Sequence, residues 1–286
     1  MSGLKKHGEL EMQTRSLGSS GVLVSEVGFG TWNFKGDTAV MQQALDLGST
    51  LIDTAESYNT EIQVGASLQG RRNEAFIATK ISAWNFRYAD VLKSADQSLQ
   101  NLGIDVIDLY QLHAPSSTIP IEETMGAMDE LVRAGKIRFV GVSNFAVEEL
   151  EAAEAALTEG SIVENQVKYS IFDHAFADTV MPYCQQHGIA VLAYSPLEGA
   201  QYRAELDRNP LLGTLLESMS QETGKTPVQI LLRWGLQQPN VITIPASNSM
   251  AHLEENCEVS GWQLSNEQYA ALNAAVDTKS PTYWWR

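Results

Sequence analysis

The sequence predicts an α/β protein folded as a (β/α)8 (TIM) barrel, and three observations support this. Eight short apolar runs each lead into a segment with helical spacing, which is typical of parallel strands joined by crossover helices. The runs are apolar throughout, as expected for strands buried on both faces. The chain has 286 residues, enough for one such barrel, and no Gly-x-Gly-x-x-Gly turn of a doubly wound fold follows its first run.

A β-hairpin is predicted before the first barrel strand. Residues 12–17 and 22–25 are strand-like and flank a glycine-bounded turn. Such a hairpin has no crossover helix, so we expect it to cap the bottom of the barrel. Residues 1–11 are polar without the apolar core of a signal peptide, and we predict a flexible leader there. Residues 12–286 are predicted to form a single barrel domain, since no linker or repeat interrupts them.

Strands and helices then alternate along the chain. Asp37 is a good N-cap for the first helix, which has apolar positions on one face. The predicted strands cover residues 27–30, 50–53, 76–80, 106–113, 139–142, 162–167, 189–194 and 241–244. The predicted helices cover residues 37–47, 62–68, 92–99, 121–134, 147–157, 180–187, 211–219 and 227–236, and the longest connection runs from 195 to 211.

Composition and charge argue against several kinds of partner. The chain is 44% hydrophobic and 19% charged, which is ordinary for a globular protein. Its formal net charge of −16 argues against nucleic acid and anionic membranes, because both would repel it. No apolar run approaches the roughly 18 residues of a membrane span. The two cysteines, Cys184 and Cys257, lie far apart, and we expect reduced thiols in a cytoplasmic protein.

Four chemically different side chains follow three successive predicted strands. Asp53 ends the second strand and Tyr58 lies in the loop after it. Lys80 and His113 end the third and fourth strands. Barrel enzymes carry their active sites at this C-terminal edge, so we expect the four groups to converge there. A metal site is not expected, because no second histidine or cysteine falls near His113.

These four groups are suited to protonating a carbonyl oxygen. A free tyrosine has a pKa of about 10, which is too high for an efficient acid at neutral pH. A nearby ammonium group favours the phenolate, so Lys80 is expected to lower the pKa of Tyr58. Asp53 would hold that ammonium in place, because an unpaired buried charge is costly. His113 would orient the carbonyl oxygen by a hydrogen bond.

Seven short motifs occur in order along the chain, and together they are highly specific although each alone is weak. They are Gly28-Phe-Gly-Thr-Trp32, Asp53-Thr-Ala-Glu-Ser-Tyr58, Ala78-Thr-Lys80, Asp108-Leu-Tyr-Gln-Leu-His113, Gly141-Val-Ser-Asn-Phe145, Asn165-Gln166 and Tyr194-Ser-Pro-Leu197. From about Met12 to its last helix the chain resembles the aldo-keto reductases. The resemblance implies a catalytic tetrad of Asp53, Tyr58, Lys80 and His113, with Tyr58 as general acid. It also implies hydride transfer from a nicotinamide cofactor to an aldehyde or ketone.

The resemblance further implies cofactor-binding residues, position by position. Ser143, Asn144 and Gln166 match the residues that hold the nicotinamide carboxamide, which both donates and accepts hydrogen bonds. Tyr194 matches the aromatic residue that stacks on the nicotinamide ring. The other cofactor-binding candidates are Thr31, Trp32, Ser195, Pro196, Leu197, Ile244, Ala246, Ser247, Asn248, His252, Glu255 and Asn256.

Two of these positions weaken the expected signal for NADPH. Members of the family selective for NADPH often carry lysine at the position of Ala246 and arginine at that of His252. Alanine offers no charge, and histidine is only partly protonated at neutral pH. Ser247 and Asn248 can still donate hydrogen bonds to a phosphate, so NADPH is the expected cofactor and NADH the alternative. Asn59 stands where the family commonly has glycine, but asparagine tolerates a positive φ.

Aromatic residues are the candidates for substrate binding. Trp32 and Trp84 follow the first and third strands and should line the mouth of the barrel, and Phe86 is a further candidate. Trp284 and Trp285 form an unusually apolar end of the sequence, which either folds over the pocket or seals a helix or a partner. Such walls would favour apolar or aromatic carbonyl compounds.

Two other functions are left open by the sequence. A lyase or aldolase would use Lys80 to form a Schiff base, although Asp53 would keep that amine charged and unreactive. A non-catalytic regulatory subunit that retains the cofactor pocket would carry the same motifs, although the complete tetrad favours an enzyme. A small carbonyl compound is the expected partner, and a monomer is expected because family members are often monomers.

Overall fold

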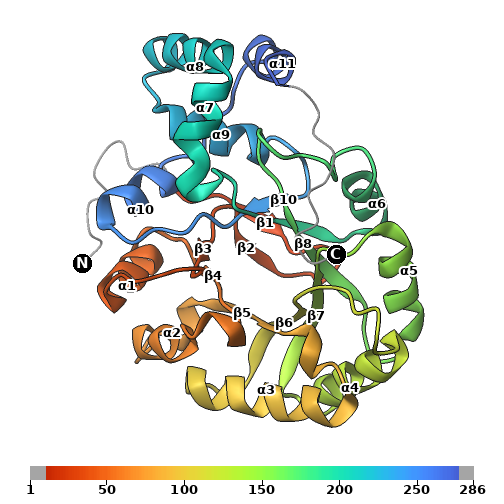
Figure 1. Ribbon diagram of the computed structural model, residues 1–286. Helices are drawn as coiled ribbons and strands as arrows, with labels where there is room; N and C mark the ends of the chain where they lie inside the picture. The colour runs from red at the N-terminus through yellow and green to blue at the C-terminus, as the bar shows by residue number, and fades with distance from the viewer. Residues whose placement is uncertain (1–10, 277–286) are drawn as a thin grey trace.

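The computed structural model describes residues 11–276, and its central element is a ring of parallel strands surrounded by helices (Figure 1). The eight barrel strands, β3 to β10, pair in sequence order. The ring closes between its ends, where Gly28 N donates to Thr243 O at 2.8 Å and Gly30 N donates to Pro245 O at 3.2 Å. The predicted (β/α)8 barrel is confirmed.

The strands lie close to their predicted positions. They are β3 (Phe29–Gly30), β4 (Leu51–Asp53), β5 (Phe76–Ile81), β6 (Ile107–Leu112), β7 (Ile137–Ser143), β8 (Ile162–Lys168), β9 (Ala190–Tyr194) and β10 (Val241–Thr243). The α-helices are α1 (Thr38–Asp46), α2 (Glu61–Ser67), α3 (Tyr88–Leu102), α4 (Ile121–Arg133), α5 (Val147–Ala156), α6 (Val180–His187), α7 (Tyr202–Arg208), α8 (Pro210–Thr223), α9 (Pro227–Leu236), α10 (Met250–Cys257) and α11 (Asn266–Ala274).

The first crossover helix shows why the sequence folds this way. Asp37 Oδ1 accepts a hydrogen bond from Ala39 N at 2.9 Å, which satisfies one of the free N–H groups at the start of α1. The buried residues of this helix fall on one face, which packs against the barrel: Val40, Met41, Ala44 and Leu45. Both features were predicted from the sequence.

The N-terminal hairpin of β1 (Thr14–Ser16) and β2 (Leu23–Ser25) caps the bottom of the barrel, as predicted. Gly18 in its turn has φ +51°, and a Cβ there would lie 2.3 Å from the carbonyl oxygen of Val163, near the start of β8. Only glycine allows this approach. Leu17 and Val24 are fully buried and extend an apolar layer inside the lower barrel that includes Leu51, Phe76, Leu109, Val163, Leu192 and Ile242.

One connection differs from the prediction. Residues 195–211 contain the 3-10 turn η4 (Gly199–Gln201) and helix α7 rather than a loop alone. The polar segment of α7 has few apolar positions, so it lacks the hydrophobic period that marks a packed helix. Residues 1–10 of the expected leader lie outside the described residues, as do Trp284 and Trp285. No helix between residues 11 and 276 is long and apolar enough to cross a membrane.

Candidate active site

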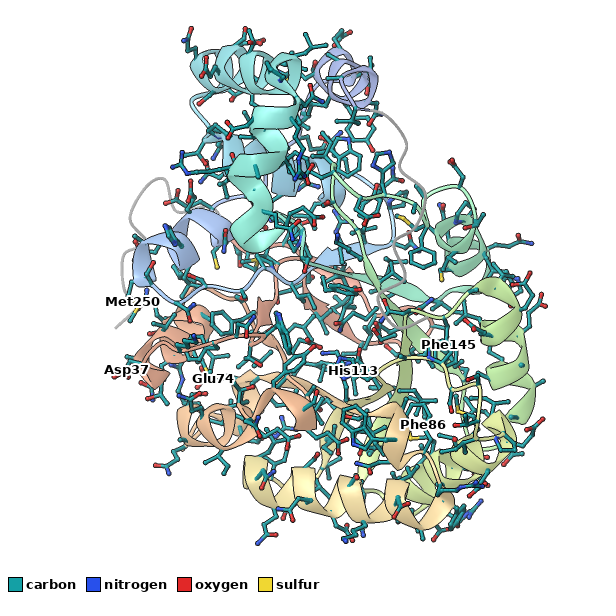
Figure 2. All side chains as sticks on the ribbon, in the orientation of Figure 1. Asp37, Glu74, Phe86, His113, Phe145 and Met250 are labelled. Carbon is teal, nitrogen blue, oxygen red and sulfur yellow. The ribbon has the colours of Figure 1, made fainter. Side chains whose placement is uncertain are left out.

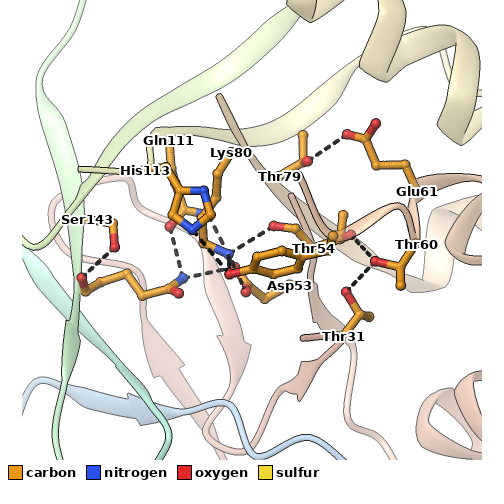
Figure 3. Close-up of polar contacts among 12 residues, drawn as sticks. Thr31, Asp53, Thr54, Thr60, Glu61, Thr79, Lys80, Gln111, His113 and Ser143 are labelled. Carbon is orange, nitrogen blue, oxygen red and sulfur yellow. Dashed lines mark hydrogen bonds and ion pairs between the residues drawn. The ribbon is translucent and has the colours of Figure 1, made fainter. Parts of the chain in front are cut away.

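A buried ion pair lies inside the barrel at the C-terminal ends of β4 and β5 (Figure 3). Lys80 Nζ lies 2.6 Å from Asp53 Oδ1 and also donates to the carbonyl oxygen of Thr54 at 2.9 Å. The lysine is 0% exposed. Burial alone would lower the pKa of Lys80, but the charge of Asp53 and the contact with Tyr58 hold this pKa above its ordinary value. Lys80 is therefore a fixed ammonium group.

Two glutamine side chains hold the other oxygen of Asp53. Gln166 Nε2 donates to Asp53 Oδ2 at 2.9 Å and to Gln111 Oε1 at 3.0 Å, while Gln111 Nε2 donates to Asp53 Oδ2 at 3.3 Å. We call Gln111 and Gln166 the amide layer. Sequence reasoning missed Gln111, although a polar residue two positions before His113 in an apolar strand would have indicated the same inward face. Charge-assisted bonds of this kind keep the Asp53 carboxylate aimed at Lys80.

Tyr58 ends the 3-10 turn η1 (Glu56–Tyr58), which follows β4 directly. Glu56 anchors this turn, since its carboxylate accepts from Ser82 N at 2.8 Å and from Asn85 Nδ2 at 3.1 Å. Asn59 follows with φ +59°, so the predicted tolerance of a left-handed residue here is confirmed. The turn places the Tyr58 hydroxyl 3.4 Å from Lys80 Nζ and 3.3 Å from His113 Nε2.

The pKa of Tyr58 differs from the prediction. Burial is the largest influence and raises the pKa above its ordinary value, Lys80 lowers it, and Asp53 raises it again. Lys80 thus lowers this pKa as predicted, but the net direction is upward. The physical reason is that burial of the phenol outweighs the effect of the Lys80 ammonium, and the Asp53 carboxylate beside that ammonium adds to the rise.

His113 presents a neutral imidazole to the Tyr58 hydroxyl. Its backbone N–H donates to Ile81 O at 2.9 Å, which fixes the residue just past β6. Burial, assisted by the Lys80 ammonium, lowers the pKa of His113 to about 3. The Tyr58 and His113 rings meet edge to face at 5.4 Å. At neutral pH, His113 is thus a hydrogen-bonding group without charge.

A second set of polar side chains borders these four groups at the ends of β7, β8 and β9. Tyr194 OH donates to Asn144 Oδ1 at 3.0 Å, and Asn144 Nδ2 donates to Ser143 Oγ at 2.9 Å and to His113 O at 3.3 Å. Ser143 Oγ donates to the backbone oxygen of Gln166 at 2.9 Å. Asn144 has φ +65°, an unusual conformation of the kind that clusters at functional sites. This chain of bonds connects Tyr194 through Asn144 to the backbone of His113.

These groups fit a nicotinamide. An amide oxygen has two acceptor sites, so Asn144 Oδ1 can accept from a ligand as well as from Tyr194. Ser143 and Gln166 border the same edge of the barrel. The amide of Gln166 is also turned toward Asp53, a role that the sequence did not indicate.

The predicted phosphate-binding segment runs from the end of β10 into α10. Ser249 caps α10 by accepting from His252 N at 3.4 Å, and Ser247 Oγ donates to Ser249 O at 2.8 Å. Asn248 Oδ1 accepts from Lys35 N at 2.7 Å, which ties this segment to the loop after β3. Ala246 and His252 are exposed. Hydroxyl groups at a helix start suit a phosphate.

The remaining cofactor candidates are partly covered by other parts of the chain. The hydroxyl of Thr31 is buried and lies 2.9 Å from that of Thr60. Ser195 has φ +50° at the end of β9. Leu197 packs against the core, Ile244, Pro196 and Asn256 are buried, and Glu255 is half-buried.

The aromatic candidates separate into two groups. Trp32 is 57% exposed and its ring meets that of Tyr58 at 4.8 Å, and Trp84 is 73% exposed on the turn η3 (Ala83–Asn85) after β5. Phe86 is only 1% exposed, and Thr124 Oγ1 of α4 donates to its backbone oxygen at 2.9 Å (Figure 2). Phe86, a predicted substrate-binding residue, is therefore not exposed at the barrel mouth, because the chain turns at the end of η3 and its ring lies in the main hydrophobic core.

Known proteins resemble this chain over most of its length. A family model described as the aldo/keto reductase family matches residues 26–277. The methylglyoxal reductase YeaE of Escherichia coli strain K12 is 32% identical, with 92% of this chain and 95% of that protein covered. The aldo-keto reductase YhdN of Bacillus subtilis strain 168 is 31% identical, with 93% and 94% covered.

Solved structures agree with the sequence comparison. The thermostable aldo-keto reductase Tm1743, in complex with the inhibitor epalrestat, superposes with a TM-score of 0.86 at 35% identity and covers 93% of this chain and 100% of its own. An aldo/keto reductase from Klebsiella pneumoniae in complex with NADP and acetate gives a TM-score of 0.84 at 30% identity, with 95% and 98% covered. With the barrel and the buried ion pair beside a tyrosine and a histidine, these matches show that the chain belongs to the aldo/keto reductase family.

Proposed function

We propose that this protein reduces aldehydes or ketones to alcohols with NADPH, and that Tyr58 supplies the proton. One observation carries the proposal: a single phenol hydroxyl lies 3.4 Å from the buried Lys80 ammonium and 3.3 Å from His113 Nε2. The hydroxyl stands at the C-terminal edge of a barrel, where the active sites of barrel enzymes lie. The half-buried Tyr58 ring faces the exposed Trp32, so a small carbonyl compound can approach it.

Ser143, Asn144, Gln166 and Tyr194 are the residues that we propose to hold the nicotinamide. Relatives support this cofactor, since the Klebsiella pneumoniae protein was solved with NADP and a sorbitol-6-phosphate dehydrogenase from Malus domestica is named as NADP-dependent. When bound, NADPH supplies a hydride to the carbonyl carbon.

The chain's own residues handle the proton. Tyr58 donates its hydroxyl proton to the carbonyl oxygen as negative charge develops there. Lys80 then lies 3.4 Å from the phenolate oxygen and stabilises it, so its charge acts mainly after the proton has begun to leave. Asp53 and the amide layer keep the ammonium in position. Neutral His113 orients the substrate oxygen without competing as an acid.

The geometry disfavours the two alternatives. A Schiff base requires a neutral, accessible amine, whereas Lys80 is 0% exposed, paired with Asp53 and raised in pKa. A non-catalytic subunit would not need a phenol hydroxyl placed within reach of both an ammonium group and an imidazole.

Replacement of the Tyr58 hydroxyl tests the proposal. We expect Tyr58→Phe to lower kcat with an aromatic aldehyde by about 10²–10⁴-fold, because general acid catalysis has that magnitude. Binding of NADPH, followed by its fluorescence, should stay unchanged. Tyr88→Phe, on the exposed first turn of α3, is the matched control and should keep full activity. A Tyr58→Phe protein with kcat near that of the wild type would refute the assigned role.

Cofactor preference can be tested at the segment that lacks a cation. We expect Ala246→Lys with His252→Arg to raise the NADPH-to-NADH ratio of kcat/KM by about fivefold, since a charge-assisted contact to a partly exposed phosphate adds about 1 kcal/mol. Ala152→Lys on α5, on the opposite side of the barrel from α10 (Figure 1), controls for the addition of a positive charge elsewhere on the protein. An equal change with Ala152→Lys, or no change with the double variant, would contradict the placement of the phosphate.

We also propose that the protein works as a monomer in the cytoplasm. The reduced state of Cys184 and Cys257 supports this location, since both are buried free thiols. Sedimentation equilibrium at micromolar concentration should give the monomer mass of 31.4 kDa.

A further inference from the structure

Glu164 lies on β8 inside the barrel, two residues before Gln166 and therefore on the same inward face. Its Cα partner across the sheet is Gly141 of β7. A Cβ on Gly141 would lie 2.4 Å from Glu164 Oε2 and 3.0 Å from Gln111 Cγ. The absence of a side chain at Gly141 thus makes the space that the Glu164 carboxyl group occupies. The Glu164 carboxyl group and the side chain of Gln111, which belongs to the amide layer, therefore border the same space.

The carboxyl group of Glu164 is buried without a partner. The residue is 0% exposed, and neither Oε1 nor Oε2 has a hydrogen-bond partner among the described residues. An isolated carboxylate in such a place is very costly, so the group takes up a proton instead. The one ammonium close by, Lys80, is already neutralised by Asp53.

The surrounding charges also favour the acid form. Burial raises the pKa of Glu164 well above its ordinary value, the Asp53 carboxylate raises it further, and Lys80 lowers it by less. The ionisable groups around Glu164 are Asp53 from β4, Lys80 from β5 and the Cys184 thiol from α6, whose own pKa Glu164 raises. The strand partners on β7 and β9, Gly141 and Ala190, carry no charge.

We propose that Glu164 is a positioning residue of the catalytic centre: as an uncharged acid it fills the space beside Gln111 and keeps the amide layer directed at Asp53. This inference rests on the proposed roles of Asp53 and Lys80. An ionised Glu164 would be a strong acceptor beside Gln111 and would compete with Asp53 for the Gln111 amide, whose bond to Asp53 is already 3.3 Å long. A void at Glu164 would instead leave space into which the Gln111 side chain could move away from Asp53.

The protonation state can be measured without turnover. The infrared difference spectrum between wild type and Glu164→Gln at pH 7 should show the carbonyl band of one protonated carboxylic acid. Carboxylate bands in that difference spectrum would overturn the proposal. Glu61→Gln is the matched control, because Glu61 is equally buried but accepts bonds from Thr79 and Asn101 outside the centre.

Two variants test the positioning role in turnover. Glu164→Gln keeps the size and the lack of charge, so we expect kcat within about twofold of wild type. Glu164→Ala empties the space, and we expect kcat to fall about tenfold with NADPH affinity unchanged, since small displacements of catalytic groups cost this much or more. The alkaline limb of the kcat–pH profile of this variant should move to lower pH. An Asp53 carboxylate that is held less firmly raises the pKa of Tyr58 less.

The outcomes separate this inference from the proposed function. Glu164→Ala with the kcat and pH profile of the wild type, while Tyr58→Phe is inactive, would overturn the role of Glu164 alone. A tenfold loss in Glu164→Gln would also overturn it, because the acid proton itself would then be required. If Tyr58→Phe stays active, the proposed function fails, and the infrared result still decides the protonation state of Glu164.

Discussion

Asp53→Asn isolates the energetic role of the buried ion pair. Lys80 is 0% exposed and the side chain of Asp53 is 3% exposed, so the variant leaves an ammonium group in the barrel without a counter-ion. The new amide NH₂ would also face the Nε2 donors of Gln111 or Gln166 in place of an acceptor. Removal of one partner from a buried pair costs about 3–5 kcal/mol of unfolding free energy. In a chain of this size that corresponds to a fall in Tm of about 10 °C.

The assay is urea unfolding at 25 °C and pH 7. We expect Asp53→Asn to lower the urea midpoint of unfolding and to leave the m-value unchanged. The matched variant is Asp53→Asn with Lys80→Met, which removes both charges and should recover most of the loss. A loss below about 1 kcal/mol for Asp53→Asn, or a double variant less stable than Asp53→Asn, would refute the reasoning, because the cost would then not come from an unpaired ammonium.

The same variant has a defined pH dependence. In the wild type the pKa of Lys80 is raised, so its contribution to stability is fully present below the pKa of the unfolded chain and is lost as pH rises through the folded value. Without Asp53, burial lowers the pKa of Lys80, the unfolded state binds more protons, and stability rises with pH. The stability gap between Asp53→Asn and wild type should therefore narrow as the pH approaches the ordinary lysine pKa.

Two further predictions concern the mouth of the barrel. Because the pKa of His113 is about 3, its imidazole NMR resonance, assigned with His113→Gln, should not titrate between pH 8 and 5. For the same reason, protonation of His113 should not reduce kcat in this pH range. A titration midpoint near pH 6.5 would contradict the neutral imidazole. Trp84 is 73% exposed, so Trp84→Ala should change stability by less than about 0.5 kcal/mol yet raise KM for an aromatic aldehyde about fivefold. Leu211→Ala, equally exposed on α8, is the control, and an unchanged KM in Trp84→Ala would exclude a substrate contact.

The barrel was predictable because its local signals agree. Continuous apolar strands, an N-cap such as Asp37 and the glycine turns of the hairpin each indicate the same alternation of elements. Strand order followed from that alternation, so the convergence of Asp53, Lys80 and His113 needed only the barrel rule. A local pattern does not show how deeply a loop side chain is buried, so Phe86 was named as a substrate-binding candidate although it is buried.

The interior polar groups were harder to predict because they depend on neighbours from other strands. Gln111, Glu164 and Gln166 share one inward face by their period of two, but which acceptor each one meets depends on the register between strands. A glycine on one strand, Gly141, admits the carboxyl group of another. No reading of one strand alone reveals that pairing.

The raised pKa of Tyr58 changes how the ion pair must be understood. If Lys80 strongly lowered that pKa in the resting protein, part of its effect would be spent on ionising the phenol before substrate arrived. Burial outweighs the effect of Lys80 on this pKa, Asp53 raises the pKa further, and Tyr58 stays protonated through the neutral range. The ammonium, held 3.4 Å away, interacts most strongly when the proton has left. A stabilisation that grows toward the transition state is the kind that raises kcat, so the neutralised pair suits an acid better than a free lysine would.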